Sequence, residues 1–209
     1  MKVLAVVGSP RKGGNTDVLV DRISQGARAN GAEVEKVFLN DLDLRPCQAC
    51  DACQTKNLYK GCVLKDDMPA VHRSLRECDA LIIGTPVYWF GPSAQTKIFL
   101  DRWYCLVVPG EKTPDYALKG KRVALAITYG DVDPFTAGAA NVYATIRDAA
   151  TFAGAKIVGV AYGTGAEKGS IAGNQAAMEA AYELGRRLCL SGGGGLSPEG
   201  DGAKATTAE

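Results

Sequence analysis

Five short segments rich in apolar residues punctuate the chain and predict five β-strands. The first, at residues 3–7, is an unbroken apolar run with several β-branched residues, and it stops at Gly8-Ser9-Pro10. Such a run is typical of a strand buried on both faces of a parallel sheet. The other four predicted strands lie at residues 33–39, 80–84, 122–128 and 156–161.

Between these strands, apolar residues recur with the spacing of amphipathic helices. Leu19, Ile23 and Ala27 mark one such face, and Asn15-Thr16 is predicted to cap that helix. The other predicted helices begin at Asp66 or cover about residues 93–104, 135–152 and 174–189. The alternation predicts an α/β fold with a five-stranded parallel sheet and helices on both faces.

We expect one domain over residues 1–190, interrupted by a cysteine-rich insertion at residues 46–66. Residues 191–209 are rich in Gly, Ser, Thr and Ala and are predicted to form a flexible tail.

The loop after the first strand has the composition of a phosphate cradle. Loop glycines and the amino terminus of a helix present backbone N–H groups to an anion. The loop lacks the lysine of a Walker A motif and the second glycine of a dinucleotide fingerprint. Its hydroxyl, amide and guanidinium groups suit a terminal phosphomonoester, although an ordinary surface loop is the alternative. The candidate phosphate ligands are Ser9, Arg11, Gly14, Asn15 and Thr16.

Two further loops should meet this one, because ligands of open parallel sheets bind beyond the carboxyl ends of the strands. The loop at residues 85–91 carries Pro86, Val87, Tyr88, Trp89 and Phe90, and the loop at residues 129–134 begins with Tyr129 and Gly130. Exposed aromatic residues favour a planar ligand or a partner subunit, although they could also fill the core beneath the next helix. A phosphate cradle with aromatic walls suits flavin mononucleotide (FMN) better than ATP or NAD.

Composition narrows the class of protein further. The 209 residues are 46% hydrophobic and 22% charged, with a net charge of +1, which is ordinary for one globular domain. Scattered charges give no indication of a nucleic-acid or membrane partner. The first apolar run is too short for a signal peptide, so we expect a cytoplasmic protein.

Four of the seven cysteines are clustered as Cys47-x2-Cys50-x2-Cys53-x8-Cys62. Four thiolates at this spacing can surround a [4Fe–4S] cluster, whereas structural zinc usually takes two separated Cys-x2-Cys pairs. A cluster, zinc and free or redox-active thiols all remain open. The isolated Cys78, Cys105 and Cys189 are expected to be small core residues, and His72 is expected to be structural.

Taken together, several motifs resemble the NADPH-dependent FMN reductase family, and within it the iron–sulfur flavoprotein branch. They are residues 8–16, the four clustered cysteines, Asp66-Asp67-Met68, residues 84–89, and Lys97 with Phe99 and Asp101-Arg102. The gap between Cys53 and Cys62 is slightly longer than is usual in that branch.

The resemblance implies a flavodoxin-like sheet that binds FMN. Ser9, Arg11, Asn15 and Thr16 would then hold the phosphate, and residues 86–90 would line the ribityl chain and isoalloxazine. It also implies NAD(P)H as electron donor, a small-molecule or protein acceptor, and a homodimer or homotetramer. Asp101 and Arg102 would be interface or helix-end residues, or Lys97 and Asp101 would form a surface salt bridge.

The expected activity is FMN-dependent NAD(P)H oxidoreduction, with electrons passed to a flavin, quinone, nitro compound or iron–sulfur acceptor. The alternative is an iron–sulfur flavoprotein that carries electrons between protein partners. A binding module held together by zinc would leave the aromatic loop unexplained.

Overall fold

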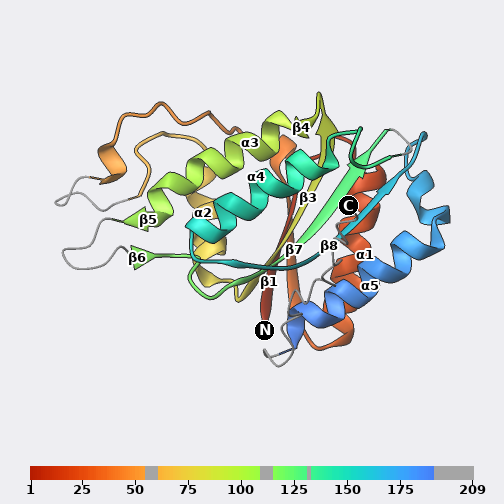
Figure 1. Cartoon of the computed structure of the whole chain (residues 1–209). Coiled ribbons are helices and arrows are strands. Elements are labelled where there is room, and N and C mark those ends of the chain that lie inside the picture. The colour runs from red at the N-terminus through yellow and green to blue at the C-terminus, as the bar shows by residue number, and fades with distance from the viewer. Residues whose placement is uncertain (55–60, 109–114, 131–132, 191–209) are drawn as a thin grey trace, which may run out of the picture.

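The computed structural model describes residues 1–54, 61–108, 115–130 and 133–190 and has a parallel sheet at its centre (Figure 1). The strands are β1 (Lys2–Val7), β2 (Glu33–Phe38), β3 (Ala80–Tyr88), β7 (Arg122–Tyr129) and β8 (Lys156–Thr164). Their order across the sheet is β2-β1-β3-β7-β8, and every neighbouring pair is parallel. This is the flavodoxin order, which confirms the predicted fold class.

The central sheet has one strand more than the five predicted. A two-residue strand, β4 (Gly91–Pro92), folds back antiparallel onto the end of β3 and makes a sixth. β3 also runs further than predicted, so residues 85–88 are strand rather than loop.

Helices cover both faces of the sheet, as predicted (Figure 1). The first helix α1 (Asn15–Ala29) and the last helix α5 (Gln175–Cys189) lie on one face. The opposite face is covered by α2 (Met68–Glu77), α3 (Ala94–Asp101) and α4 (Ala139–Phe152). Alternate residues of β1 enter the two cores: Leu4 and Val6 join the second of these faces, and Val3, Ala5 and Val7 the first.

Three helices begin or end differently from the prediction. α2 begins at Met68 rather than Asp66. α3 stops at Asp101 and continues as a 3-10 turn, η3 (Arg102–Leu106). α4 begins at Ala139 because Gly138, with φ of 86°, precedes it in the left-handed conformation. The remaining short elements are η1 (Leu39–Asp41), η2 (Ala52–Gln54), β5 (Val107–Val108), β6 (Asp115–Tyr116) and η4 (Ser170–Gly173).

Helices α1 and α5 cross in unusually close contact at two glycines. A Cβ atom added to Gly26 would lie 2.0 Å from the backbone oxygen of Tyr182, and one added to Gly185 would lie 1.9 Å from that of Ile23. No side chain fits between the two backbones at either point, so both glycines are required by this packing.

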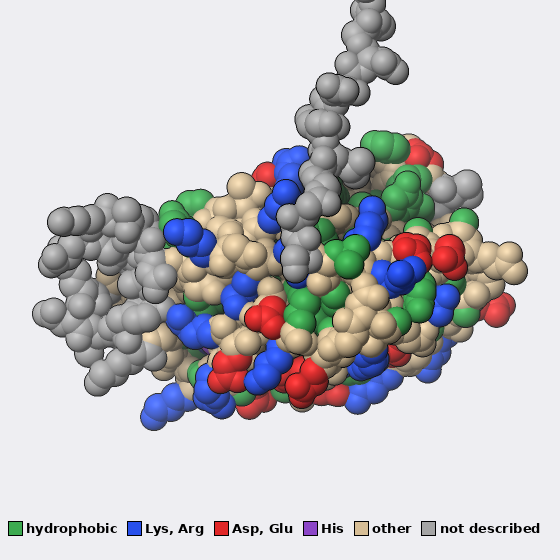
Figure 2. Space-filling view, turned by 90° about the horizontal axis from the view of Figure 1, so that it is seen from below, with side chains coloured by type: hydrophobic (Ala, Val, Ile, Leu, Met, Phe, Trp, Pro, Cys, Tyr) green, Lys and Arg blue, Asp and Glu red, His purple; other side chains and the backbone are tan. Residues whose placement is uncertain are grey.

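The surface carries charges of both signs. In Figure 2, Lys and Arg side chains are interspersed with Asp and Glu side chains across the described part of the face shown. Among the described residues, no helix is long and apolar enough to cross a membrane. The predicted flexible tail, residues 191–209, lies outside the described residues.

Candidate functional site

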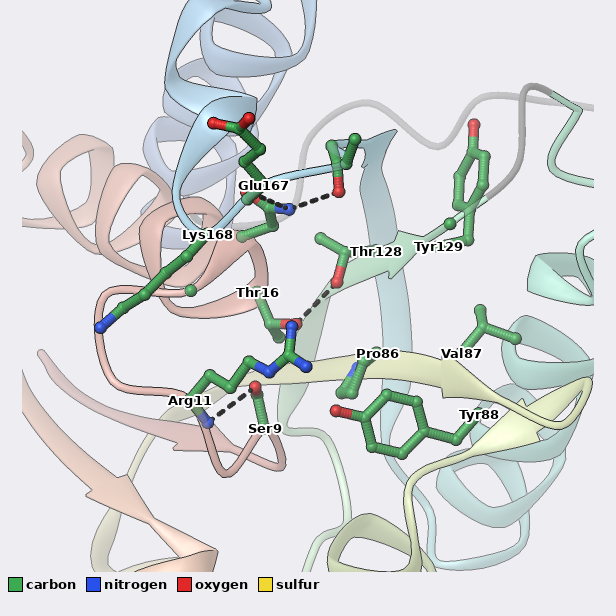
Figure 3. Close-up of a pocket in the computed structure, with 15 residues that line it drawn as sticks. Ser9, Arg11, Thr16, Pro86, Val87, Tyr88, Thr128, Tyr129, Glu167 and Lys168 are labelled. Atoms are coloured by element: carbon green, nitrogen blue, oxygen red, sulfur yellow. Dashed lines mark hydrogen bonds between the residues drawn. The ribbon is translucent and has the colours of Figure 1, made fainter.

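One cavity of about 230 Å³ lies beyond the carboxyl ends of the central strands, where the three predicted loops meet (Figure 3). Ser9, Arg11 and Thr16 lie at one end of it, and Val87 and Tyr129 at the other. Ten of the twelve predicted nucleotide-binding residues line this cavity: Ser9, Arg11, Gly14, Asn15, Thr16, Pro86, Val87, Tyr88, Tyr129 and Gly130. The predicted convergence of distant loops is therefore present in the structure.

The amino terminus of α1 forms the floor of the cavity and is not capped as predicted. Gly14, rather than Asn15-Thr16, is the N-cap residue, and no side chain caps this terminus. The loop is held from behind instead, because the N–H of Gly13 donates to Asp17 Oδ2 at 2.7 Å. Lys36 balances the charge of Asp17 through a 2.7 Å ion pair. The first-turn N–H groups of α1 are thus left without a side-chain cap and could bind an anion in the cavity.

Hydroxyl groups line the same end of the cavity and retain protons to donate. Ser9 Oγ accepts a hydrogen bond from the N–H of Arg11 at 3.2 Å, so its own proton is available to a ligand. The hydroxyls of Thr16 and Thr128 lie 2.6 Å apart, so one of them donates to the other and the acceptor keeps its proton. In Figure 3 the guanidinium of Arg11 reaches over Thr16. These groups match the several oxygens of a phosphomonoester.

A fourth segment, residues 165–168 after β8, also lines the cavity and was not predicted. Asn15 holds it in place. The Asn15 amide donates to the backbone oxygens of Gly165 and Glu167 at 2.8 and 3.0 Å, and its oxygen accepts from the N–H of Ile171 at 3.1 Å. Both ends of this side chain are therefore engaged with the protein, and its role in the structure is to position this loop.

The last two predicted residues, Trp89 and Phe90, line a second hollow of about 320 Å³ beside the first. The two hollows share Val87 and Gly130. Trp89 and Phe90 form the two-residue turn between β3 and β4, and their φ angles are 47° and 62°. Such turns favour Asn and Gly because positive φ strains other residues, and strain of this kind concentrates at functional sites.

The strained turn is supported by the start of α4. A Cβ atom on Gly138 would lie 2.6 Å from Cα of Phe90, and Asn141 Nδ2 donates to the Phe90 oxygen at 3.3 Å. The backbone is thus held firmly, while the Trp89 side chain is 95% exposed. The alternative that these aromatic residues fill the core is wrong for Trp89 and Phe90, which are both exposed.

The clustered cysteines lie in a segment that follows β2 and η1. Gln54, next to Cys53, donates to the backbone oxygens of Tyr104 and Val107, beyond the carboxyl end of α3. Cys47 and Cys50 are exposed, Cys62 is half-buried and Cys53 is buried. Burial, followed by the neighbouring charges of Cys62 and Cys47, raises the pKa of Cys53. The donors suit an iron–sulfur cluster or zinc in kind. Among the described residues, however, no three His, Cys, Asp or Glu side chains are already arranged to hold a metal ion, so the cysteines would have to move together to bind one.

A buried ion pair fixes both ends of this segment. Arg102 binds both carboxylate oxygens of Asp66, with Nη1–Oδ2 and Nη2–Oδ1 distances of 2.5 and 3.1 Å. The same guanidinium donates to the backbone oxygen of Arg45 at 2.7 Å. Arg102 lies at the end of α3, as expected of a helix-end residue. Its side chain and that of Asp66 are only 1% and 0% exposed, so this ion pair is buried. The alternative surface pair of Lys97 with Asp101 is present at 2.5 Å.

The isolated polar and thiol groups have the structural roles expected of them. His72 and Cys105 are buried with Sγ and Nδ1 3.5 Å apart. Burial first, and then the positive charge of Arg102, lowers the pKa of His72 to about 4, so the imidazole is neutral at pH 7. Cys78 is also buried in the core, and Cys189 is half-buried against the other core face.

The strand order and the position of the cavity define a protein of the flavodoxin-like class. Within that class, the chain belongs to the NADPH-dependent FMN reductase family, whose sequence profile matches residues 1–176.

Its relatives include iron–sulfur flavoproteins and flavin oxidoreductases. The iron–sulfur flavoprotein of Methanosarcina thermophila is 34% identical over 130 residues, which are 62% of this chain and 63% of that protein. A putative NAD(P)H-dependent FMN-containing oxidoreductase of Bacillus subtilis is 29% identical over 90% of this chain and 98% of that protein. The alignments cover only 51 to 63% of the length of three iron–sulfur flavoproteins that the chain matches.

Solved structures share the fold over most of the chain. The Trp repressor binding protein from Bacillus subtilis has a TM-score of 0.62 at 26% identity, covering 88% of this chain and 98% of that one. The NAD(P)H:quinone oxidoreductase from Methanothermobacter marburgensis has a TM-score of 0.66 at 18% identity, covering 93% and 99%. The second likeness concerns the fold alone.

Proposed function

We propose that this protein binds FMN along the edge of its sheet and oxidises NAD(P)H, passing electrons to a flavin, quinone, nitro compound or iron–sulfur acceptor. One observation carries the proposal: a phosphate cradle and an exposed aromatic turn border two hollows that share Val87 and Gly130. A ligand with a phosphate at one end and a large flat ring at the other matches this arrangement. Family membership and the relatives named above support it.

In this proposal, each part of the site has a different role. The amino terminus of α1, Arg11, Ser9 and Thr16 bind the phosphate. Val87 borders both hollows and Pro86 lines the first beside it, where a ribityl chain would run. Tyr88, Trp89 and Phe90 would orient the ring together with Tyr129 and Gly130. Bound FMN supplies the redox chemistry, accepting hydride from NAD(P)H, so the protein needs no nucleophile–base pair. The exposed aromatic turn also favours a homodimer or homotetramer with the site near the interface.

Flavin binding and reduction test the proposal directly. We expect purified protein to be yellow, or to turn yellow with added FMN, and to bleach promptly when NADPH is added without oxygen. Arg11→Ala should weaken FMN binding about tenfold or more, because charge-assisted hydrogen bonds to phosphate contribute about 1.5–3 kcal/mol. Circular dichroism should show an unchanged fold. A protein that binds no FMN would contradict the proposal, and FMN binding without bleaching would favour an electron carrier.

We propose, as a second candidate function, an iron–sulfur flavoprotein that relays electrons between protein partners. The observation in its favour is the set of four cysteine donors, with Ala49 and Asp51 between them at φ of 50° and 53°. Left-handed residues between the first three cysteines let a short loop curve sharply. The names of the related iron–sulfur flavoproteins point the same way.

Iron content distinguishes an iron–sulfur flavoprotein from a flavin oxidoreductase that holds FMN alone. Protein purified without oxygen is expected to be brown and to contain about four iron and four acid-labile sulfide per chain if it holds a [4Fe–4S] cluster. Cys50→Ser should lower both values while FMN content is retained, whereas Cys189→Ser should change neither. Zinc in place of iron, or no metal at all, would rule out the iron–sulfur candidate.

A further inference from the structure

We propose that Lys168, on the loop between β8 and η4, binds the phosphate from the side opposite Arg11 and makes the site selective for phosphorylated flavin. This inference rests on the proposed FMN binding. It adds one phosphate-binding side chain, from a segment that no sequence motif identifies. The loop is residues 165–169, referred to below as the closing loop.

The closing loop is packed directly against the phosphate cradle. A Cβ atom on Gly169, whose φ is 76°, would lie 3.1 Å from the backbone oxygen of Gly13. Because Gly169 has no side chain, the two loops can approach this closely. Two hydrogen bonds from the Asn15 amide, to the backbone oxygens of Gly165 and Glu167, then hold the closing loop to the first turn of α1. A third, from the N–H of Ile171 to the Asn15 oxygen, holds η4 just beyond the loop. The two loops therefore form one unit, although they are far apart in the chain.

Lys168 extends from this loop toward the cradle. A Cβ atom on Gly13 would lie 3.5 Å from Lys168 Cε and 3.9 Å from its Nζ, and Lys168 is among the residues that line the cavity. Figure 3 shows its chain running toward the loop that carries Arg11, whereas the carboxylate of Glu167 points away from that loop. The ammonium is thus close to the backbone that would enclose a phosphate.

The pairing of the charges around the cavity favours a phosphate as the partner of Lys168. Within the described part of the chain, neither Lys168 nor the guanidinium of Arg11 has an ion pair. The third cation of this region, Lys12, is already engaged with Asp41 at 2.6 Å and lies 5.3 Å from the centre of the Phe38 ring. Asp17, the nearest acid behind the loop, is neutralised by Lys36. Two cations at the rim of one cavity match a phosphomonoester, which carries close to two negative charges at pH 7.

Paired titrations with FMN and riboflavin test this role, since the two ligands differ by the phosphate. Lys168→Gln is expected to weaken FMN binding about tenfold and to leave riboflavin binding unchanged. The loss should shrink at high salt, where exposed charges are screened. Lys168→Arg should retain FMN affinity within about threefold. Lys12→Gln is the matched control and should change the affinity for either flavin by less than about twofold.

A double-mutant cycle tests whether Asn15 positions Lys168. In an Asn15→Ala background, the effect of Lys168→Gln on FMN binding should fall from about tenfold to less than threefold. Equal losses of FMN and riboflavin in Lys168→Gln, or no loss of either, would overturn the inference while the proposed function stands. Wild-type protein that binds neither flavin would overturn both.

Discussion

Replacing Arg102 by methionine is expected to lower the free energy of unfolding by about 3–5 kcal/mol. The substitution leaves the carboxylate of Asp66 buried without its cation, and removing one partner of a buried ion pair has a cost of this size. It also removes the donor to the Arg45 oxygen, so both ends of the cysteine segment lose their anchor. Urea unfolding followed by circular dichroism measures the change.

Acid pH should reduce the difference in unfolding free energy between wild type and Arg102→Met. Burial alone would raise the pKa of Asp66, but hydrogen bonds from Arg102 and from the N–H groups of Arg45 and Met68 lower it overall. A carboxyl whose folded pKa is depressed contributes stability above its unfolded pKa, about 3.9, and loses it as the pH falls through the folded value. The gap between wild type and Arg102→Met should therefore be full at pH 7 and shrink as the pH falls and the buried Asp66 of the variant is protonated, while wild type keeps its contribution until the pH approaches the depressed folded pKa.

Two controls separate the ion pair from a general effect of charge removal. Lys97→Met breaks the exposed pair with Asp101 and should change stability by less than about 1 kcal/mol. Replacing Asp66 and Arg102 together by leucine and methionine should recover most of the loss, because no charge is then buried alone. A loss from Arg102→Met no larger than that from Lys97→Met would contradict the role assigned to the buried pair.

Gly26→Ala and Gly185→Ala are each expected to destabilise the protein by about 2–3 kcal/mol. Helix propensity alone predicts the opposite sign, since alanine is favoured over glycine inside a helix by about 1 kcal/mol. The added methyl group meets a backbone oxygen at 1.9–2.0 Å, so α1 and α5 must move apart and lose packing along their contact. The sign of the change in unfolding free energy therefore decides between the two effects.

The double variant sharpens this test. Once either methyl group has separated the helices, the second methyl group has room. The loss of unfolding free energy in the double variant should therefore be smaller than the sum of the losses in the two single variants. Gly173→Ala is the matched control, because a Cβ atom there meets nothing within 4 Å and its loss should be below about 0.5 kcal/mol. Stabilisation by both Gly26→Ala and Gly185→Ala would show that the helices do not meet as closely as described.

Much of the fold was predictable because its signals are local. Buried parallel strands are apolar along their length, and the order of strands and helices restricts the topology to few choices. The extension of β3 through Pro86 was not predictable, because proline normally argues against a strand. In the structure β3 pairs with β1 only over Ala80–Gly84, so Pro86 lies beyond the end of β1 and needs no N–H on that side.

The site was predictable where it follows strands and unpredictable where it depends on tertiary contacts. The loops after β1, β3 and β7 had to meet, since parallel strands end at one edge. Residues 165–168 carry no motif, and their place becomes apparent only through Asn15, which is 150 residues away from Gly165. Arg102 was expected to be an interface or helix-end residue, and its burial with Asp66 was not predictable, because charged side chains are rarely buried and only the fold brings Asp66 to it.

The paired ends of the cysteine segment have a consequence for how this protein could vary. Asp43 and Asp67 exchange hydrogen bonds of 2.8 and 3.0 Å, so the chain leaves the sheet and returns to it at the same point. The segment between them therefore begins and ends on a closed stem, and doubling the length of such an excursion adds only about 0.6 kcal/mol of closure entropy. Lineages could lengthen this segment at little cost, whereas one that lost it would also lose Cys53 from the core and leave the cation of Arg102 buried without Asp66.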